Sequence, residues 1–242
     1  NDILALKEAD CGIALASGIS AARSVSEVVL TDSDFSVLPE IVNEGRRVVN
    51  NIERVASMYL IKTTYSFILS VLSIVISHEY PFYPVQLSLI SSICVGIPSF
   101  FLALEPNYTK VKKGFIVKVF RNALPAGLCV FLNIFFIIMI SNIFNVDFDS
   151  LRFVVVGATG YLNLYLLYKI CSPLTLIRKI LLVACSISFV LSMILFREFL
   201  LLSIPSVWGI ILMILLILAD NYLVWLFTLI YDFIVKLFGG KK

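Results

Sequence analysis

Apolar residues follow two different patterns along this chain. Over residues 1–34, short apolar runs alternate with Ala, Gly, Ser and acidic positions, whereas from Pro39 onward the apolar stretches are much longer. A helix needs about 20 apolar residues to cross the hydrocarbon core of a bilayer, and the later stretches approach that length. The pattern therefore predicts a short α/β segment followed by a polytopic, mainly α-helical membrane domain.

The first 34 residues alternate between helix-like and strand-like patterns. Residues 3–9 and 19–26 are predicted as helices, and residues 11–15 and 27–30 as strands. This alternation is typical of the end of an α/β domain with a parallel sheet. Because so few residues cannot build a hydrophobic core, we expect the rest of that domain to precede residue 1.

One long helix is predicted from Pro39 to the loop that begins at Tyr80. Its first half is rich in polar residues, and its second half, from about Met58, is apolar. A helix of roughly 39 residues is about 58 Å long, which is about twice the thickness of the hydrocarbon core. We therefore expect residues 35–57 to form a stalk outside the membrane and to continue into the first crossing.

The predicted membrane domain covers residues 58–238 and crosses the bilayer six times, with residues 239–242 as a tail. The crossings are expected at about 58–77, 84–104, 123–144, 152–171, 180–197 and 206–228. Eleven Lys and Arg residues lie in the loops and tail on the stalk side, against only Arg152 and Arg197 on the other side. Because cytoplasmic loops carry the excess of positive charge, we expect a multi-pass plasma-membrane protein with a cytoplasmic stalk and C-terminus.

Composition agrees with this picture and excludes several classes of function. Hydrophobic residues make up 60% of the chain and charged residues 14%, whereas soluble domains carry about 25% charged residues. The net charge of +3 is too small and too scattered to predict binding to nucleic acid. The five cysteines are far apart, which favours free thiols over a disulfide framework or a zinc site.

Several short motifs occur in the order that one known family shows. They are Asn1-Asp2, Ala5-Leu6-Lys7, Ala9-Asp10 and Gly12-Ile13-Ala14, then Glu44-Gly45-Arg46-Arg47 and Asn50-Asn51-Ile52, then Pro84-Val85-Gln86-Leu87, Gly96-Ile97-Pro98 and Leu104-Glu105-Pro106-Asn107. The chain thus resembles the C-terminal part of a bacterial P-type (E1–E2) cation-transporting ATPase, whose Thr-Gly-Asp-Gly-Val-Asn-Asp motif ends in the same Asn-Asp pair. The match is specific through about residue 115 and only topological beyond it. The chain resembles a bacterial branch of this family, some of whose members are described as calcium transporters.

The resemblance implies a fold and a chemistry for the first part of the chain. Residues 1–34 would end the HAD-like phosphorylation domain, and the six membrane helices would be the fifth to tenth of the pump. Asn1 and Asp2 would be catalytic, with Asn1 near the phosphorylated aspartate and Asp2 near its Mg²⁺, in a parent protein that uses ATP and Mg²⁺. The phosphorylated aspartate is absent from this sequence, so we expect this chain alone to be inactive as an ATPase. An Asn-Asp pair without such flanking motifs is more often a helix cap.

The resemblance also points to a transport path, although the family's carboxylates are missing from it. At the corresponding positions of the fifth and sixth helices, this chain has Thr64, Phe67, Ser91, Cys94 and Val95. Oxygen ligands for a hard cation must then come from hydroxyl and amide groups and from backbone carbonyls. The predicted path contains Thr63, Thr64, Gln86, Ser88, Ser91 and Ser92, together with Gly96 and Pro98, which are expected to break the helix and free carbonyls. The alternative is that these hydroxyls only pack helices closely.

Two charged residues lie within the predicted crossings. Lys62 either extends to the membrane interface or serves as a built-in countercharge that stands in for an ion. Asp220, in the last crossing, is expected to pair with a neighbouring helix or to line a cavity. The leading hypothesis is therefore that the chain is part of an ATP-driven cation pump, with calcium as a candidate cargo and with membrane lipid, the cation and an upstream part of the same chain as partners. The alternatives are a free-standing membrane remnant or scaffold without ATPase activity, and a pump for a non-metal cargo.

Overall fold

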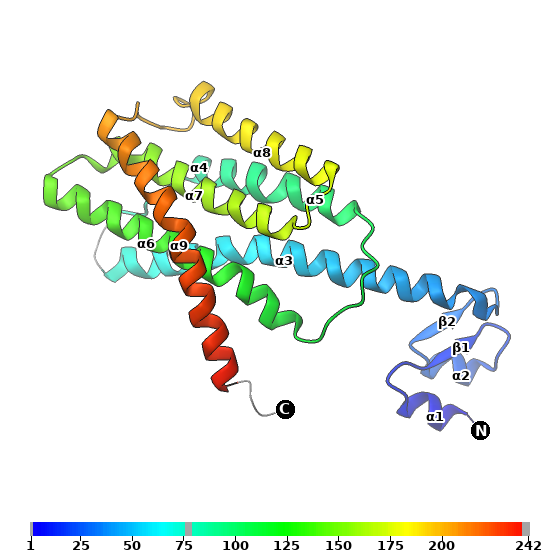
Figure 1. The fold of residues 1–242 in the computed structure, drawn as a ribbon. Coiled ribbons are helices and arrows are strands. Elements are labelled where there is room, and N and C mark those ends of the chain that lie inside the picture. The colour runs from blue at the N-terminus through cyan, green and yellow to red at the C-terminus, as the bar shows by residue number, and fades with distance from the viewer. Residues whose placement is uncertain (1, 76–78, 239–242) are drawn as a thin grey trace. The chain divides into compact units, whose positions relative to one another are not determined.

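The computed structural model describes residues 2–75 and 79–238 of the chain (Figure 1). The chain forms two compact units, each described by itself below. The first comprises Asn1–Val48 with Tyr108–Lys110, and the second comprises Val49–Asn107 with Val111–Lys242. Asn1, residues 76–78 and residues 239–242 lie outside the described residues.

The first unit contains a small α/β arrangement. Its elements are α1 (Ile3–Glu8), β1 (Ile13–Leu15), α2 (Ser20–Val25) and β2 (Val28–Leu30). The two strands pair in parallel, with Ile13 opposite Val28, as a strand–helix–strand unit requires. The backbone N–H of Gly12 donates to the Glu27 carboxylate at 2.5 Å, and a side chain at Gly12 would collide with the Leu6 carbonyl. The predicted short α/β segment is confirmed.

A short 3₁₀ turn, η1 (Phe35–Val37), precedes the longest helix of the chain. The Asp34 carboxylate accepts hydrogen bonds from the backbone N–H of Ser36, at 2.8 Å, and from its hydroxyl, at 2.6 Å. These bonds stabilise the charged form and lower the pKa of Asp34 below its usual value. Helix α3 (Leu38–Val75) then continues for 38 residues without interruption, about 57 Å at about 1.5 Å per residue.

Six helices of the described residues are long and apolar enough to cross a membrane, which confirms the predicted number of crossings. After α3, the second crossing is the helical run Pro84–Leu104, made of α4 (Pro84–Leu89), η2 (Ile90–Gly96) and α5 (Ile97–Leu104). The remaining four are α6 (Phe115–Phe144), α7 (Phe148–Ile170), α8 (Leu176–Leu195) and α9 (Val207–Phe238). The proposed boundaries between phosphorylation domain, stalk and membrane domain stay a prediction.

The second crossing corrects one expectation. Gly96 and Pro98 do not break this helix; instead, the seven residues of η2 form a π-helix, and the backbone N–H of Ile97 donates to the Ser92 carbonyl five residues earlier. Pro98 lacks an N–H, so it cannot continue the usual α-helical bonding at that point. A wider π turn absorbs the mismatch, and such π segments inside α-helices are frequent at functional sites.

Helices α6 and α7 form the buried centre of the second unit, and α9 packs against both of them (Figure 1). Glycines allow some of these close contacts: an added side chain at Gly160 of α7 would overlap the Phe189 ring of α8. By contrast, α8 and α9 expose many large apolar side chains, as expected for faces that contact lipid.

Candidate functional site

The residues predicted to serve phosphoryl transfer lie at the start of the first unit. Asn1 is outside the described residues, and Asp2 is exposed, directly before α1. The backbone carbonyl of Asp2 accepts from the Leu6 N–H at 2.9 Å, but its side chain makes no capping hydrogen bond. A single exposed carboxylate is a suitable oxygen ligand for Mg²⁺, yet it does not form a site without further ligands. No cluster of three or more metal-ligating side chains occurs in the described part of the chain.

The predicted polar residues of α3 do not point the same way. Thr63 is exposed, and its hydroxyl donates to the Tyr59 carbonyl at 3.3 Å. Thr64 donates to the Leu60 carbonyl at 2.8 Å and faces α6, where an added side chain at Gly127 would lie 2.8 Å from it. Thr64 therefore packs two helices together, as the bland interpretation predicts. Lys62 is half-buried and belongs to no ion pair found among the described residues.

Sequence reasoning missed Tyr65, a buried polar side chain of α3. Tyr65 is fully buried, and its hydroxyl lies near the Cys94 thiol of η2. That hydroxyl has no hydrogen-bond partner within the described residues, which is costly for a buried polar group. The signal was present in the spacing of Ile61, Tyr65 and Leu69, which recur every four residues along one buried stripe of the helix.

The predicted residues of the second crossing are also spread over several environments. Gln86 is fully buried: its amide oxygen accepts from the Tyr83 N–H at 3.0 Å, and its amide nitrogen donates to the Leu200 carbonyl at 3.0 Å. Gln86 thus fixes the start of this helix to the segment between α8 and α9. Ser88 is exposed and donates to its own helix, to the Pro84 carbonyl at 2.9 Å.

The remaining predicted residues lie on or next to the π-helix. Ser91 donates to the Leu87 carbonyl at 2.6 Å, and Ser92 is exposed. Pro98 is buried beside the π segment, and Gly96 lies at its end. The structure therefore does not gather the eight predicted path residues into one cavity.

A charged network joins α3 to the other end of the second crossing. Arg54 of α3 contacts the Glu105 carboxylate at 3.1 Å, and Arg178 of α8 donates to both carboxylate oxygens at 2.9 Å. A second Arg178 nitrogen donates to the carbonyls of Cys171 at 3.1 Å and Pro173 at 2.8 Å. Charge-assisted bonds of this kind are stronger than neutral ones. Glu105, directly after α5, is therefore held from two sides.

Asn51 reinforces this connection between α3 and α5. Its side-chain nitrogen donates to the backbone carbonyls of Ala103 at 2.9 Å and Glu105 at 3.1 Å. These are carbonyls at a helix end, which have no partner inside the helix. Asn51 thus ties the body of α3 to the end of the crossing that contains the π-helix.

Comparison with curated proteins finds relatives of this chain, whereas no family model matches it. The chain is 39% identical over 194 residues, 76% of its length, to the probable cation-transporting ATPase exp7 of Streptococcus pneumoniae, of which the match covers 25%. It is 44% identical over 140 residues, 54% of its length, to the calcium-transporting ATPase CtpE of Mycolicibacterium smegmatis, of which the match covers 18%.

The chain is homologous to bacterial cation-transporting ATPases. A further relative, CtpE of Mycobacterium tuberculosis, is 41% identical over 140 residues. The matches cover about a quarter or less of the length of these relatives. The homology, the six membrane helices and the parallel strands together confirm the predicted resemblance and fold class.

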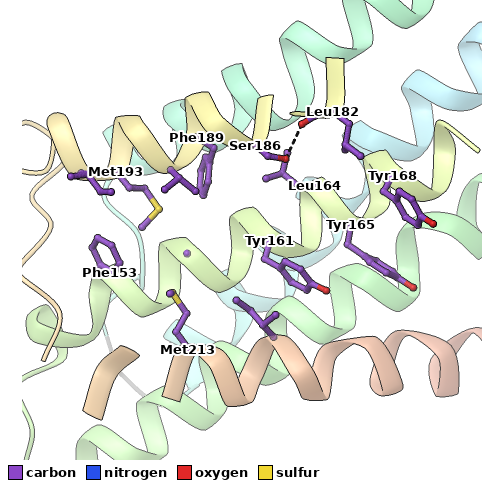
Figure 2. A pocket seen from close by; sticks show the side chains of 14 residues that line it. Phe153, Tyr161, Leu164, Tyr165, Tyr168, Leu182, Ser186, Phe189, Met193 and Met213 are labelled. Carbon is purple, nitrogen blue, oxygen red and sulfur yellow. Dashed lines mark hydrogen bonds between the residues drawn. The ribbon is translucent and has the colours of Figure 1, made fainter. Parts of the chain in front are cut away.

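The second unit also has an apolar cavity between helices. It measures about 450 Å³ and is lined by α7, α8 and α9 (Figure 2). Tyr161, Tyr165 and Tyr168 lie in a row along α7 on one side of it, and Phe189 and Met193 of α8 lie on the other. None of the predicted transport residues lines this cavity. Its apolar lining suits hydrocarbon rather than a hard cation.

Proposed function

We propose that this chain supplies the end of the phosphorylation domain and six membrane helices to an ATP-driven cation pump, with calcium as the favoured cargo. The observation that carries the proposal is the 39% identity over 194 residues to a protein named as a cation-transporting ATPase. The calcium assignment is supported by two CtpE relatives that are named as calcium-transporting. ATP and Mg²⁺ would be used by the full-length protein, in which Asn1 and Asp2 would be catalytic and Asp2 would supply one oxygen ligand to Mg²⁺.

Helix α3 is the element that suits the transmission of force. It is continuous from Leu38 to Val75, so a displacement at its polar start reaches its apolar end without a hinge. Arg54 and Asn51 then connect it to Glu105 and to the carbonyls at the end of α5. A tilt of α3 would therefore pull on the helix that contains the π segment, and alternate the access to the ion.

The proposed cargo site lies near Tyr65 of α3 and Cys94 of η2. Its ligands would be the Tyr65 hydroxyl, which has no hydrogen-bond partner among the described residues, and backbone carbonyls of η2. The sequence has no Asp or Glu within residues 58–77 or 84–104. Hard divalent cations bind most tightly where carboxylates contribute. We therefore propose that the pump carries at most one divalent ion per cycle, with its remaining ligands from another part of the full-length protein.

The orientation follows from the charges at the ends of the crossings. Eleven Lys and Arg residues lie on the side of the start of α3, against two on the other. We propose that the start of α3 and the C-terminus lie in the cytoplasm of a bacterial cell and that the six helices span its plasma membrane.

The test uses the full-length protein in sealed vesicles, with ATP added on the outside of inside-out membranes. We expect a phosphorylated intermediate and calcium accumulation that both depend on calcium and Mg²⁺. Tyr65→Phe is expected to weaken calcium affinity by about tenfold, because it removes one oxygen ligand. Tyr222→Phe, at an exposed position of α9, is the matched control and should leave the affinity unchanged.

Two outcomes would contradict the proposal in different ways. A phosphorylated intermediate without calcium accumulation would overturn the calcium assignment and favour another cargo. Absence of any phosphorylated intermediate in the folded full-length protein would overturn the pump itself and favour the membrane remnant. The coupling role of Glu105 is tested by Glu105→Gln, which should form the intermediate but transport fewer ions per phosphorylation event.

A further inference from the structure

A carboxylic side chain lies inside the membrane domain, away from the network around Glu105. Asp220 of α9 is fully buried, and both of its carboxyl oxygens lie 3.0 Å from the side-chain nitrogen of Asn133 on α6. Asn133 is itself only 4% exposed. These two residues come from helices that are 87 positions apart in the sequence, and neither belongs to the cargo site proposed above.

The pair lies deep in the membrane rather than at its surface. Helices α6 and α9 also meet through Arg121 and Asp232, whose closest atoms are 2.6 Å apart. Asn133 follows Arg121 by twelve residues, and Asp220 precedes Asp232 by twelve residues. At about 1.5 Å per residue, this separates the two contacts by about 18 Å along the helices, which is more than half of the roughly 30 Å hydrocarbon core.

The surroundings of Asp220 provide no positive charge. No Lys or Arg of the described residues forms an ion pair with it. The titratable groups close enough to interact with it are the Cys129 thiol on α6 and the Tyr161 phenol on α7, and neither is cationic. An ionised carboxylate without a cation is strongly disfavoured in such an environment.

Hydrogen bonding to Asn133 suits the neutral carboxylic acid better than an isolated carboxylate ion. Both Asp220 oxygens lie 3.0 Å from the same atom of the Asn133 amide. A neutral carboxylic acid can accept there from an amide N–H, or donate its O–H there to an amide oxygen. The direction of the Asn133 amide is a matter of rotation about one bond, which interchanges its oxygen and nitrogen.

We propose that Asp220 is a proton-binding site in the interior of the membrane domain, and that it holds a proton at neutral pH while hydrogen-bonded to the Asn133 side chain. Protonation forms one O–H bond with a hydrated proton (H₃O⁺) from the solution, leaves a neutral water molecule behind, and changes no oxidation state. A metal ion is a poor alternative occupant of this site, because the described residues contain no cluster of metal-ligating side chains. The site does not depend on the cargo or on phosphorylation.

Tyr161 gives this site a polar neighbour on the side of the cavity. Its hydroxyl donates to the Asn221 side-chain oxygen at 2.9 Å, and Asn221 directly follows Asp220 in α9. Tyr161 is also the first of the three tyrosines in a row along α7 (Figure 2). The Tyr161 hydroxyl therefore lies near Asp220, on the face of α7 that lines the cavity.

The test is infrared spectroscopy of the full chain in lipid nanodiscs at neutral pH, with aspartate labelled by ¹³C at its side-chain carboxyl group. Apart from Asp220 and Asp232, every described aspartate is exposed, and Asp232 is paired with Arg121. We expect one carbonyl band of a protonated, labelled carboxylic acid, which is lost in Asp220→Asn and kept in Asp232→Asn. The band should shift when water is replaced by D₂O.

The wild-type spectrum alone decides the proposal if a variant does not fold. Only carboxylate bands in the labelled, folded protein would mean that Asp220 is ionised, and the proposal would be wrong. If Asp220→Asn folds and removes a carboxylate band rather than the acid band, the proposal is also wrong. A role in packing alone predicts no labelled acid band, so the readout separates it from proton binding.

Discussion

Two carboxyl groups of the second unit, Glu105 and Asp220, have opposite kinds of partner. At Glu105, a carboxylate is held by Arg54 and Arg178, near the ends of helices. At Asp220, a carboxyl group is held by the neutral amide of Asn133, well inside a helix bundle. Near a helix end, long cationic side chains can reach both the carboxylate and water. In the bundle centre a cation would itself lose its solvation, so an uncharged partner has a smaller desolvation penalty.

Removal of a charge from the Glu105 network is expected to have the largest effect. Arg178→Met keeps the apolar stem but removes one of the two cations at Glu105 and the donor to the carbonyls of Cys171 and Pro173. Breaking a buried ion pair in this way should lower the free energy of unfolding by about 3 kcal/mol. The measurement is denaturation of the folded chain in mild detergent. Arg197→Met is the control, because the Arg197–Glu198 pair that it removes is exposed. It should lower the free energy of unfolding by less than about 1 kcal/mol.

The two variants must differ for the comparison to stand. Equal losses in Arg178→Met and Arg197→Met would mean that the Glu105 network does not stabilise the fold beyond an ordinary surface pair.

Removal of the amide partner at the membrane centre is expected to have the second-largest effect. Asn133→Leu leaves the Asp220 carboxyl group buried without a hydrogen bond, which should cost about 1–3 kcal/mol of unfolding free energy. Detergent denaturation again measures it, with Asn142→Leu, at an exposed position of α6, as a control in which no buried partner is lost. An unchanged stability would show that the acid needs no partner there.

The double variant Asn133→Leu/Asp220→Leu sharpens this test. Replacement of both polar partners by apolar groups can be nearly neutral, so most of the loss seen in Asn133→Leu should be recovered. A double-mutant cycle with Asp220→Leu gives the coupling between the two residues. If the losses simply add, the two side chains do not act as a pair.

The exposed ion pair between the same two helices should have the smallest effect. Arg121 and Asp232 are 44% and 39% exposed at their side chains, so Asp232→Asn should cost at most about 1 kcal/mol. Salt should reduce this difference further, because exposed charges are screened. Denaturation at low and high salt measures it. A loss larger than that of Asn133→Leu would reverse the contrast between helix ends and bundle centre.

The sequence predicted the helices and strands, whereas only the structure shows which helix face each side chain occupies. The alignment by family resemblance placed Thr64 and Phe67 at the transport path, but Thr64 faces Gly127 of α6 and Phe67 is 70% exposed. Tyr65, between them, is the side chain that lies near Cys94. A helix turns by about 100° per residue, so neighbouring residues lie on different faces. In lipid both faces of a helix are apolar, and hydropathy therefore does not show which face a residue occupies.

The sequence by itself determined that the chain has six membrane helices after a small α/β segment, and that it is related to cation-transporting ATPases. Those conclusions depend on local composition, on the length of apolar runs and on motifs read in order. Only the tertiary structure decided that Glu105 lies between Arg54 and Arg178, and that Asp220 meets Asn133. These partners lie far apart in the sequence, and their contact depends on how helices rotate and pack, which local pattern does not encode.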